Sequence, residues 1–61
     1  MSTLTRAEQD ALDAVARHGS IKAAAYALGK SPHTLTVQLA NARRTLGADS
    51  TVQAYARARS A

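Results

Sequence analysis

The stretch that most constrains the fold is Ser31–Gly47, which reads SPHTLTVQLANARRTLG and carries both a start and a stop signal for a helix. Ser31 is a favoured N-cap residue, and Pro32 suits the first helical position because the N–H that proline lacks is not needed there. Gly47 is the residue type that most easily adopts the left-handed conformation just after a helix. The stretch therefore predicts a helix over residues 32–46.

The two sides of this expected helix differ in chemistry. At 100° per residue, one stripe is apolar and consists of Leu35, Leu39, Ala42 and Leu46. The opposite side combines cations with small groups that let another molecule approach closely: His33, Thr36, Val37, Ala40 and Arg44, flanked by Asn41 and Arg43. Such a helix, preceded by a shorter helix and a tight turn, is typical of the recognition helix in a helix-turn-helix motif.

Three further helices are predicted from capping residues and glycines. Thr5 and Glu8 have the spacing of a capping box, and Ser20 precedes an apolar repeat that Gly29 ends. Ser50 is the expected cap of a last helix, with Gln53 at capping-box spacing. The four expected helices cover residues 6–17, 21–28, 32–46 and 51–59. The expected inward positions of the first two are Ala11, Leu12, Val15, Ala16, Ile21, Ala24, Ala25 and Leu28.

The composition favours an all-α fold of four short helices in a single domain over residues 1–61. Fifteen of the hydrophobic residues are alanine, so the core is small and dimerisation would help to stabilise it. The absence of cysteine fits a reducing cytoplasm, and no signal peptide, membrane span or cofactor motif is visible.

The net charge of +4 is unevenly distributed. Residues 1–29 carry equal numbers of acidic and basic side chains. Residues 30–61 carry five Lys and Arg residues against Asp49 alone. The excess positive charge therefore lies in the half with the expected recognition helix, which suits a polyanion such as double-stranded DNA, although solubility alone is an equally good explanation.

The sequence contains no set of residues that indicates an enzyme or a metal site. His18 and His33 are isolated, and no acid pair or nucleophile with a base is present. Gly29-Lys30-Ser31 has the letters that end a phosphate-binding loop but lacks the upstream glycine and the preceding strand. At the start of a helix, His33 is then read as a phosphate or base-edge contact, or as simply exposed.

The order of motifs resembles the DNA-binding domain of LuxR-type (GerE-like) transcription regulators. The resemblance runs without a gap from Leu4 to about Ser50. It is carried by Leu4-Thr5, Glu8, Leu12, Val15-Ala16, Ser20, Lys22, Ala25, Leu28, Ser31, Thr34-Leu35, Asn41-Ala42 and Leu46-Gly47-Ala48. The sequence departs from the LuxR pattern at Ala23, Thr36, Gln38 and Thr45.

The resemblance implies a sequence-specific regulator whose third helix lies in the major groove and whose fourth helix pairs two copies. Thr36, Val37 and Ala40 correspond to base-reading positions, and Thr34 to a phosphate contact. The remaining phosphate contacts are expected from the turn and from nearby cations: Lys30, Ser31, Arg43, Arg44 and Lys22. For Lys22, a solvated side chain is the better explanation. Localisation is expected to be cytoplasmic, on the nucleoid.

Two questions about partners stay open at this stage. The last helix has Val52, Tyr55, Ala56 and Arg59 on one side, and this side serves equally well as a homodimer contact or as a simple cover of the core. An alternative function is a protein-binding module that pairs with a larger LuxR-type regulator through the same side. The chain is expected to be either an excised domain or, as Met1 favours, a stand-alone regulator of the kind that phages and mobile elements encode.

Overall fold

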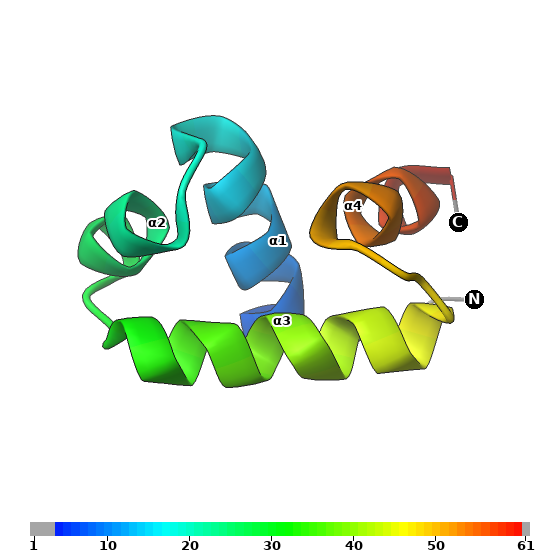
Figure 1. The fold of residues 1–61 in the computed structure, drawn as a ribbon, viewed down its shortest axis with the longest axis horizontal. Coiled ribbons are helices and arrows are strands. Elements are labelled where there is room, and N and C mark those ends of the chain that lie inside the picture. Colours follow the sequence, from blue (N-terminus) through cyan, green and yellow to red (C-terminus); the bar gives the residue numbers. More distant parts are fainter. Residues whose placement is uncertain (1–3, 61) are drawn as a thin grey trace.

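A computed structural model describes residues 4–60, which form α1 (Arg6–His18), α2 (Ile21–Leu28), α3 (Pro32–Leu46) and α4 (Thr51–Ser60). Helices α2 and α4 lie on either side of α1 and do not touch each other, while α3 runs beneath all three (Figure 1). The expected all-α fold of four short helices is confirmed. Among residues 4–60, no helix is long and apolar enough to span a membrane.

Each helix begins at a side-chain cap. In α1 both bonds of the capping box form: the Glu8 N–H donates to Thr5 Oγ1, and the Thr5 N–H donates to Glu8 Oε1, each at 3.1 Å. The hydroxyl oxygens of Ser20, Ser31 and Ser50 each accept the N–H three residues later, also at 3.1 Å. Gln53 differs from the capping-box expectation, because its side chain accepts the N–H of Asp49 instead of that of Ser50.

The turn between α2 and α3 is short because Gly29 reverses the chain at once. Gly29 has φ +67°, a left-handed conformation that a side chain would disfavour. The Lys30 N–H then donates to the Ala25 carbonyl at 2.9 Å, which ties the turn to the preceding helix. Residues 29–31 alone therefore separate the two helices and hold them in the helix-turn-helix arrangement.

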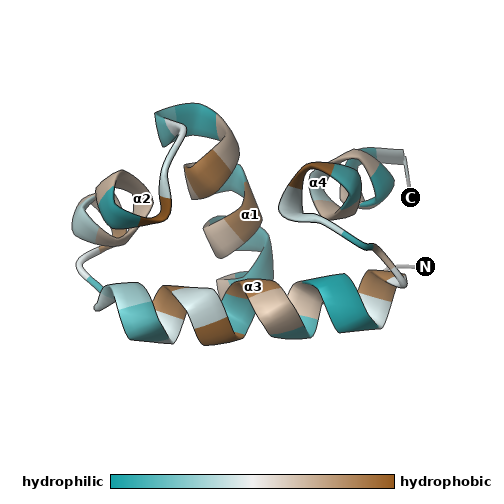
Figure 2. Ribbon diagram, in the orientation of Figure 1, coloured by the Kyte–Doolittle hydropathy of each residue, from teal (hydrophilic) through white to brown (hydrophobic). Residues whose placement is uncertain are grey.

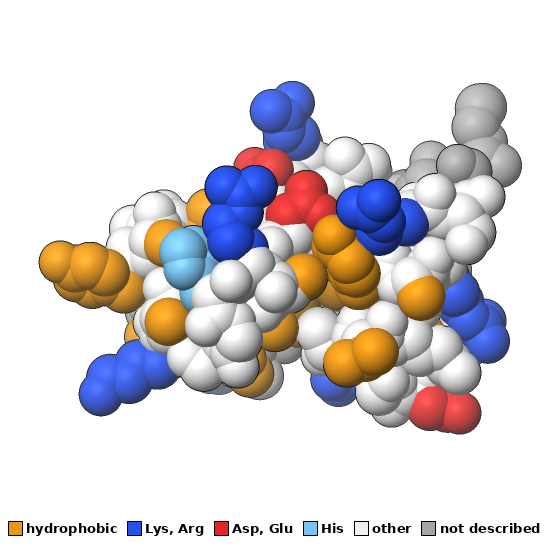
Figure 3. Space-filling view, turned by 90° about the horizontal axis from the view of Figure 1, so that it is seen from above, with side chains coloured by type: hydrophobic (Ala, Val, Ile, Leu, Met, Phe, Trp, Pro, Cys, Tyr) orange, Lys and Arg blue, Asp and Glu red, His pale blue; other side chains and the backbone are white. Residues whose placement is uncertain are grey.

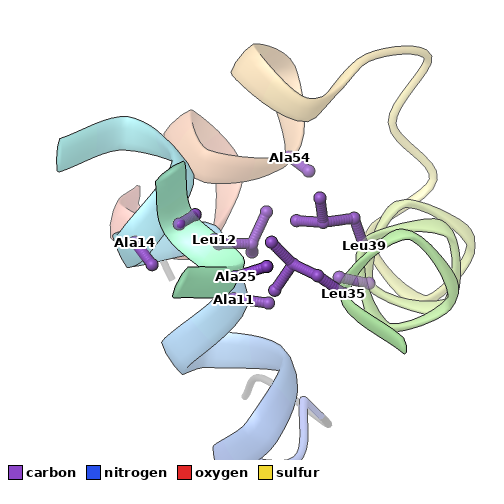
Figure 4. Close-up of a cluster of buried hydrophobic side chains, with 9 residues drawn as sticks. Ala11, Leu12, Ala14, Ala25, Leu35, Leu39 and Ala54 are labelled. Atoms are coloured by element: carbon purple, nitrogen blue, oxygen red, sulfur yellow. The ribbon is translucent and has the colours of Figure 1, made fainter. Parts of the chain in front are cut away.

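One cluster of buried side chains, to which all four helices contribute, holds the fold together. Leu12, Leu35 and Leu39 are its largest fully buried members, and they point toward one another in Figure 4. Alanines fill the remaining positions and allow the helices to approach closely: Ala11, Ala14, Ala24, Ala25, Ala42 and Ala54. Hydrophobic and hydrophilic bands alternate along α3, so only one of its sides joins this core (Figure 2).

Two expected inward positions are wrong. Ala16 is exposed and Ala14 is buried in its place, because α2, α3 and α4 all pack against α1 and make its buried side wider than one stripe. Ile21, the first residue of α2, is 38% exposed, and burial in this helix begins only at Ala24. The stripe of α3 is buried at Leu35, Leu39 and Ala42 and half-buried at Leu46.

Candidate nucleic-acid interface

The side of α3 that faces away from the core is not covered by any other helix (Figure 1). It presents His33, Val37 and Arg44 as exposed side chains, with Ala40 partly buried among them. Val37 is 45% exposed. No residue of α3 is acidic, whereas acidic and basic side chains are mixed on the opposite face of the molecule (Figure 3). The outer side of α3 thus carries no acidic group and combines small apolar groups with the Arg44 cation.

Two hydroxyl groups mark the start of this surface. Ser31 Oγ accepts the Thr34 N–H and donates its own proton to Thr34 Oγ1 at 2.9 Å. The Thr34 hydroxyl therefore keeps a proton that it can donate to an outside acceptor. Thr36 differs, because its hydroxyl donates to the Pro32 carbonyl within α3 at 2.9 Å.

Two of the expected phosphate-binding cations are held by neighbours in α3. Lys30 Nζ donates to Gln38 Oε1 at 3.1 Å, and Arg44 Nη1 donates to Asn41 Oδ1 at 2.9 Å. Both partners are neutral amides, so each cation keeps its full charge. Arg43 is partly buried on the flank of α3, and its guanidinium has no hydrogen-bond or ion-pair partner among residues 4–60.

Lys22 lies apart from the outer side of α3, on the exposed side of α2. There it borders a shallow hollow of about 510 Å³ between α2 and the start of α3, which we call the α2–α3 hollow. Lys30 borders the same hollow from the turn. Tyr26 completes it and is 89% exposed, a residue that sequence analysis did not single out. The signal that could have identified Tyr26 is its place one turn after Lys22, off the apolar stripe of α2.

The expected contact side of α4 divides into two parts. Tyr55 is half-buried and packs against the core, and Arg59 covers it, with Nη1 at 3.1 Å from the Tyr55 hydroxyl and the guanidinium carbon at 5.5 Å from the ring centre. Val52 is 80% exposed, and Ala56 is also exposed beside it. Tyr55 therefore covers the core, while Val52 and Ala56 face outward.

Arg57, which sequence analysis did not consider, joins α4 to α3. Its Nη1 donates to the carbonyl oxygens of Leu46 and Gly47, both at 3.0 Å. These carbonyls belong to the end of α3, where backbone acceptors have no partner within the helix. No group of three or more His, Asp or Glu side chains in the described part of the chain is placed to hold a metal ion.

Comparison with known families gives one match. Residues 8–49 match the family described as bacterial regulatory helix-turn-helix protein, lysR family, a segment that includes all of α2 and α3 and leaves out α4. No curated protein and no solved structure matches the sequence.

This match corrects the resemblance to LuxR-type regulators. The resemblance rested mostly on residues that either cap a helix, as Ser31 and Gly47 do, or fill the core, as Leu35 does. Any helix-turn-helix with helices of these lengths needs such residues, whichever family it belongs to. The departures from the LuxR pattern all lie at exposed or partly exposed positions: Ala23, Thr36, Gln38 and Thr45. The suggested pairing with a larger LuxR-type regulator loses its basis with the resemblance. The chain belongs to the lysR family of bacterial regulatory helix-turn-helix proteins.

Proposed function

We propose that this protein is a sequence-specific transcription regulator that places α3 in the major groove of double-stranded DNA. The observation that carries the proposal is the uncovered, acid-free outer side of α3 in a chain of a regulatory helix-turn-helix family. A major groove admits one α-helix, and the small residues of this side allow the helix backbone to come close to the bases. Such a regulator acts in the cytoplasm, where bacterial DNA lies.

Base reading is assigned to the outer side of α3. Val37, with its exposed methyl groups, suits contact with a thymine methyl, and Ala40 leaves room for a base edge. The His33 ring nitrogens can donate to or accept from a base edge. Thr36 keeps acceptor capacity on its hydroxyl oxygen, because only its proton is used within α3.

Phosphate binding is assigned to the groups that surround this side. The Thr34 hydroxyl has a proton to donate, and the Arg43 guanidinium is free of partners in the described part of the chain. Lys30 and Arg44 reach phosphates by exchanging neutral amide partners for a stronger, charge-assisted bond. Ser31 positions Thr34, and Lys22 extends the charge onto α2.

The test begins with selection of a preferred duplex from a random pool, followed by fluorescence anisotropy with that duplex and a shuffled one. We expect a preference for the selected duplex that survives physiological salt. About six to ten phosphate contacts per complex would lower affinity by on the order of 10³–10⁵ between about 50 and 200 mM salt. Equal and salt-labile binding to both duplexes, or no binding, would contradict the proposal.

Single substitutions then separate base reading from phosphate binding. Val37→Ala should change the preference at one base step by about 1–3 kcal/mol, because it removes an apolar contact with one base. Arg43→Ala should weaken binding to all duplexes alike and lower the salt slope by about 1. The matched control is Arg17→Ala, which removes one exposed cation from the end of α1. A Val37→Ala variant with unchanged base preference would remove the base-reading assignment.

We also propose that two copies pair through the outward side of α4. Val52 and Ala56 form an exposed apolar strip there, and the adjacent Arg59 is also exposed. All four helices contribute to one core, which supports the proposal that the chain is a single domain. That whole domain would then pair with a second copy. Sedimentation should show a dimer for the unmodified chain and a monomer for Val52→Asp, whose carboxylate cannot be buried unpaired. A monomer at all concentrations of the unmodified chain would exclude this pairing.

A further inference from the structure

A hollow between α1 and α4, which we call the α1–α4 hollow, lies on a part of the surface that the proposed function does not use. Its volume is about 450 Å³, and it is lined by Asp13, Ala16 and Arg17 from α1 and by Tyr55 and Arg59 from α4. No residue of α3 lines it, and Figure 1 shows α1 and α4 on the same side of α3. A duplex held by the outer side of α3 therefore leaves the hollow open.

The polar groups of this hollow come as two pairs that are each one helical turn apart. On α4, Arg59 Nη1 donates to the Tyr55 hydroxyl at 3.1 Å, so this hydroxyl keeps its own proton to donate. On α1, Asp13 and Arg17 have the spacing of an ion pair, but they form none. Neither of these two side chains has a hydrogen-bond or ion-pair partner in the described part of the chain.

The hollow therefore offers more donors than acceptors. The guanidinium groups of Arg17 and Arg59 and the Tyr55 hydroxyl can all donate to a ligand, whereas Asp13 alone can accept. Two positive charges stand against one negative charge. A carboxylate suits this set, because its two oxygens match the fork of N–H groups on a guanidinium.

The surroundings indicate where such a carboxylate comes from. A nucleic-acid strand carries evenly spaced negative charges and would place one of them against Asp13. A small free carboxylate would depend on exposed ion pairs alone, which contribute little in water. A protein segment adds apolar contacts with Ala16, which is exposed in the hollow, and with Tyr55. Its N–H groups can also satisfy Asp13.

We propose that the α1–α4 hollow docks an acidic segment of a partner protein, with one carboxylate between Arg17 and Arg59. An apolar side chain of the segment packs against Ala16 and Tyr55, and Asp13 accepts an N–H group and disfavours a run of acidic residues. This site goes beyond the proposed function and does not depend on it. Because α3 takes no part, the chain can hold the partner and a duplex at the same time.

The test begins with a random peptide library displayed on phage. Peptides are selected on the unmodified chain and counter-selected on the Arg17→Ala/Arg59→Ala double variant, so that those retained depend on the hollow. We expect them to share one acidic residue beside an apolar one. Selection of no such peptide, or of peptides without an acidic residue, would overturn the site.

Fluorescence anisotropy with a labelled selected peptide then measures the part of each cation. Arg17→Ala and Arg59→Ala should each weaken peptide binding by about two- to fivefold, the range for an exposed ion pair. The matched control is Arg6→Ala, which removes an exposed cation of α1 that does not line the hollow and should leave binding unchanged. All three positions are exposed, so circular dichroism should show a folded chain in every variant.

A charge exchange separates direct contact from a structural effect. Arg17→Glu should bind the selected peptide poorly and should bind better a peptide with lysine in place of the acidic residue. Recovery by no exchanged peptide would contradict direct contact with the carboxylate.

Two further measurements identify the occupant. The peptide should bind equally well with and without the selected duplex, and Arg17→Ala should leave the sedimentation of the chain unchanged. Displacement of the peptide by the duplex would assign the hollow to nucleic acid, and loss of a dimer in Arg17→Ala would assign it to a second copy. Either result would overturn the proposal. A chain that binds the peptide but no duplex would retain this site while the proposed function fails.

Discussion

The two ends of α3 are held in opposite ways. At its start, the bonds are local: Ser31 caps the helix and bonds to Thr34, three residues away. At its end, Gly47 turns the chain back and Arg57 reaches from α4 to the carbonyls of Leu46 and Gly47. The side-chain cap at the start is therefore supplied by α3 and the residue before it, while the carbonyls at the end also depend on how α4 is docked.

This difference matches the roles assigned to the two ends. A helix end that inserts into a groove must project from the body of the protein, so the helices behind it cannot supply its caps. The backbone at the opposite end can be anchored by tertiary contacts, because only the side chains of Arg43 and Arg44 are assigned to phosphate there. We expect changes at the start of α3 to affect DNA binding and stability, and changes to the Gly47 turn and the Arg57 contact to affect stability alone.

The largest effect should come from the core that both ends share. Leu35→Ala removes a side chain that is fully buried against α1, and it should lower the free energy of unfolding by about 2–5 kcal/mol. Urea unfolding followed by circular dichroism measures this loss. Val37→Ala, two residues along on the outer side, should change stability by less than about 0.5 kcal/mol. Similar losses in both variants would mean that the two sides of α3 are not distinct.

A smaller loss is expected at the end of α3. Gly47→Ala forces a side chain into a left-handed conformation, φ +65°, and should cost about 1–2 kcal/mol. Gly47→Asn should cost less, since asparagine tolerates this conformation better. Thermal melting compares the two variants, and DNA affinity measured well below the melting temperature should be unchanged. A loss of DNA affinity in the folded variant would break the proposed division between the two ends.

At the start of α3, Ser31→Ala removes the cap and should cost about 1 kcal/mol of stability. Ser50→Ala removes the corresponding cap of α4 and is the matched control, with a similar cost. Only Ser31→Ala should also weaken DNA binding, because Thr34 then loses the group that positions its hydroxyl. Anisotropy at a temperature where both variants are folded tests this contrast, and equal affinities would argue against it.

The smallest effect is expected for Arg57→Ala. The guanidinium is exposed and stabilises the end of α3 by about 0.3–1 kcal/mol, the range for a cation at a helix C-terminus. Amide hydrogen exchange should quicken in α4 and in the last turn of α3 and stay unchanged near Ser31. Arg59→Ala, which removes only a contact with Tyr55, should leave the last turn of α3 protected. Faster exchange at both ends of α3 would show that they are coupled.

The sequence was sufficient to predict the helices because their limits depend on local signals. Caps such as Thr5 and Ser31 form bonds within three residues, and a glycine such as Gly29 ends a helix by its own conformational freedom. The buried positions were harder to predict. Three helices pack around α1, so its buried arc is wider than one stripe and includes Ala14, which periodicity alone does not reveal.

The candidate site could be predicted only in part, because it depends on contacts between elements. The bond from Lys30 to Gln38 and the one from Arg57 to Leu46 join residues that are eight or more positions apart. The α2–α3 hollow arises from the angle between two helices, so Tyr26 had no visible role in the sequence. The resemblance to LuxR-type regulators was wrong because it is carried mainly by capping and core residues, which are set by the fold and not by the family.

The two tyrosines have a practical consequence for spectroscopy, since the chain contains no tryptophan and no phenylalanine. All intrinsic fluorescence comes from Tyr26, which stands in water on α2, and Tyr55, which is packed under Arg59 against the core. In a Tyr55→Phe variant, Tyr26 would be the remaining tyrosine fluorophore, and its emission would respond to a ligand that contacts α2. In a Tyr26→Phe variant, the remaining fluorophore would be Tyr55, and its emission would respond to unfolding. The protein thus carries separate optical reporters of binding and folding and needs no added dye.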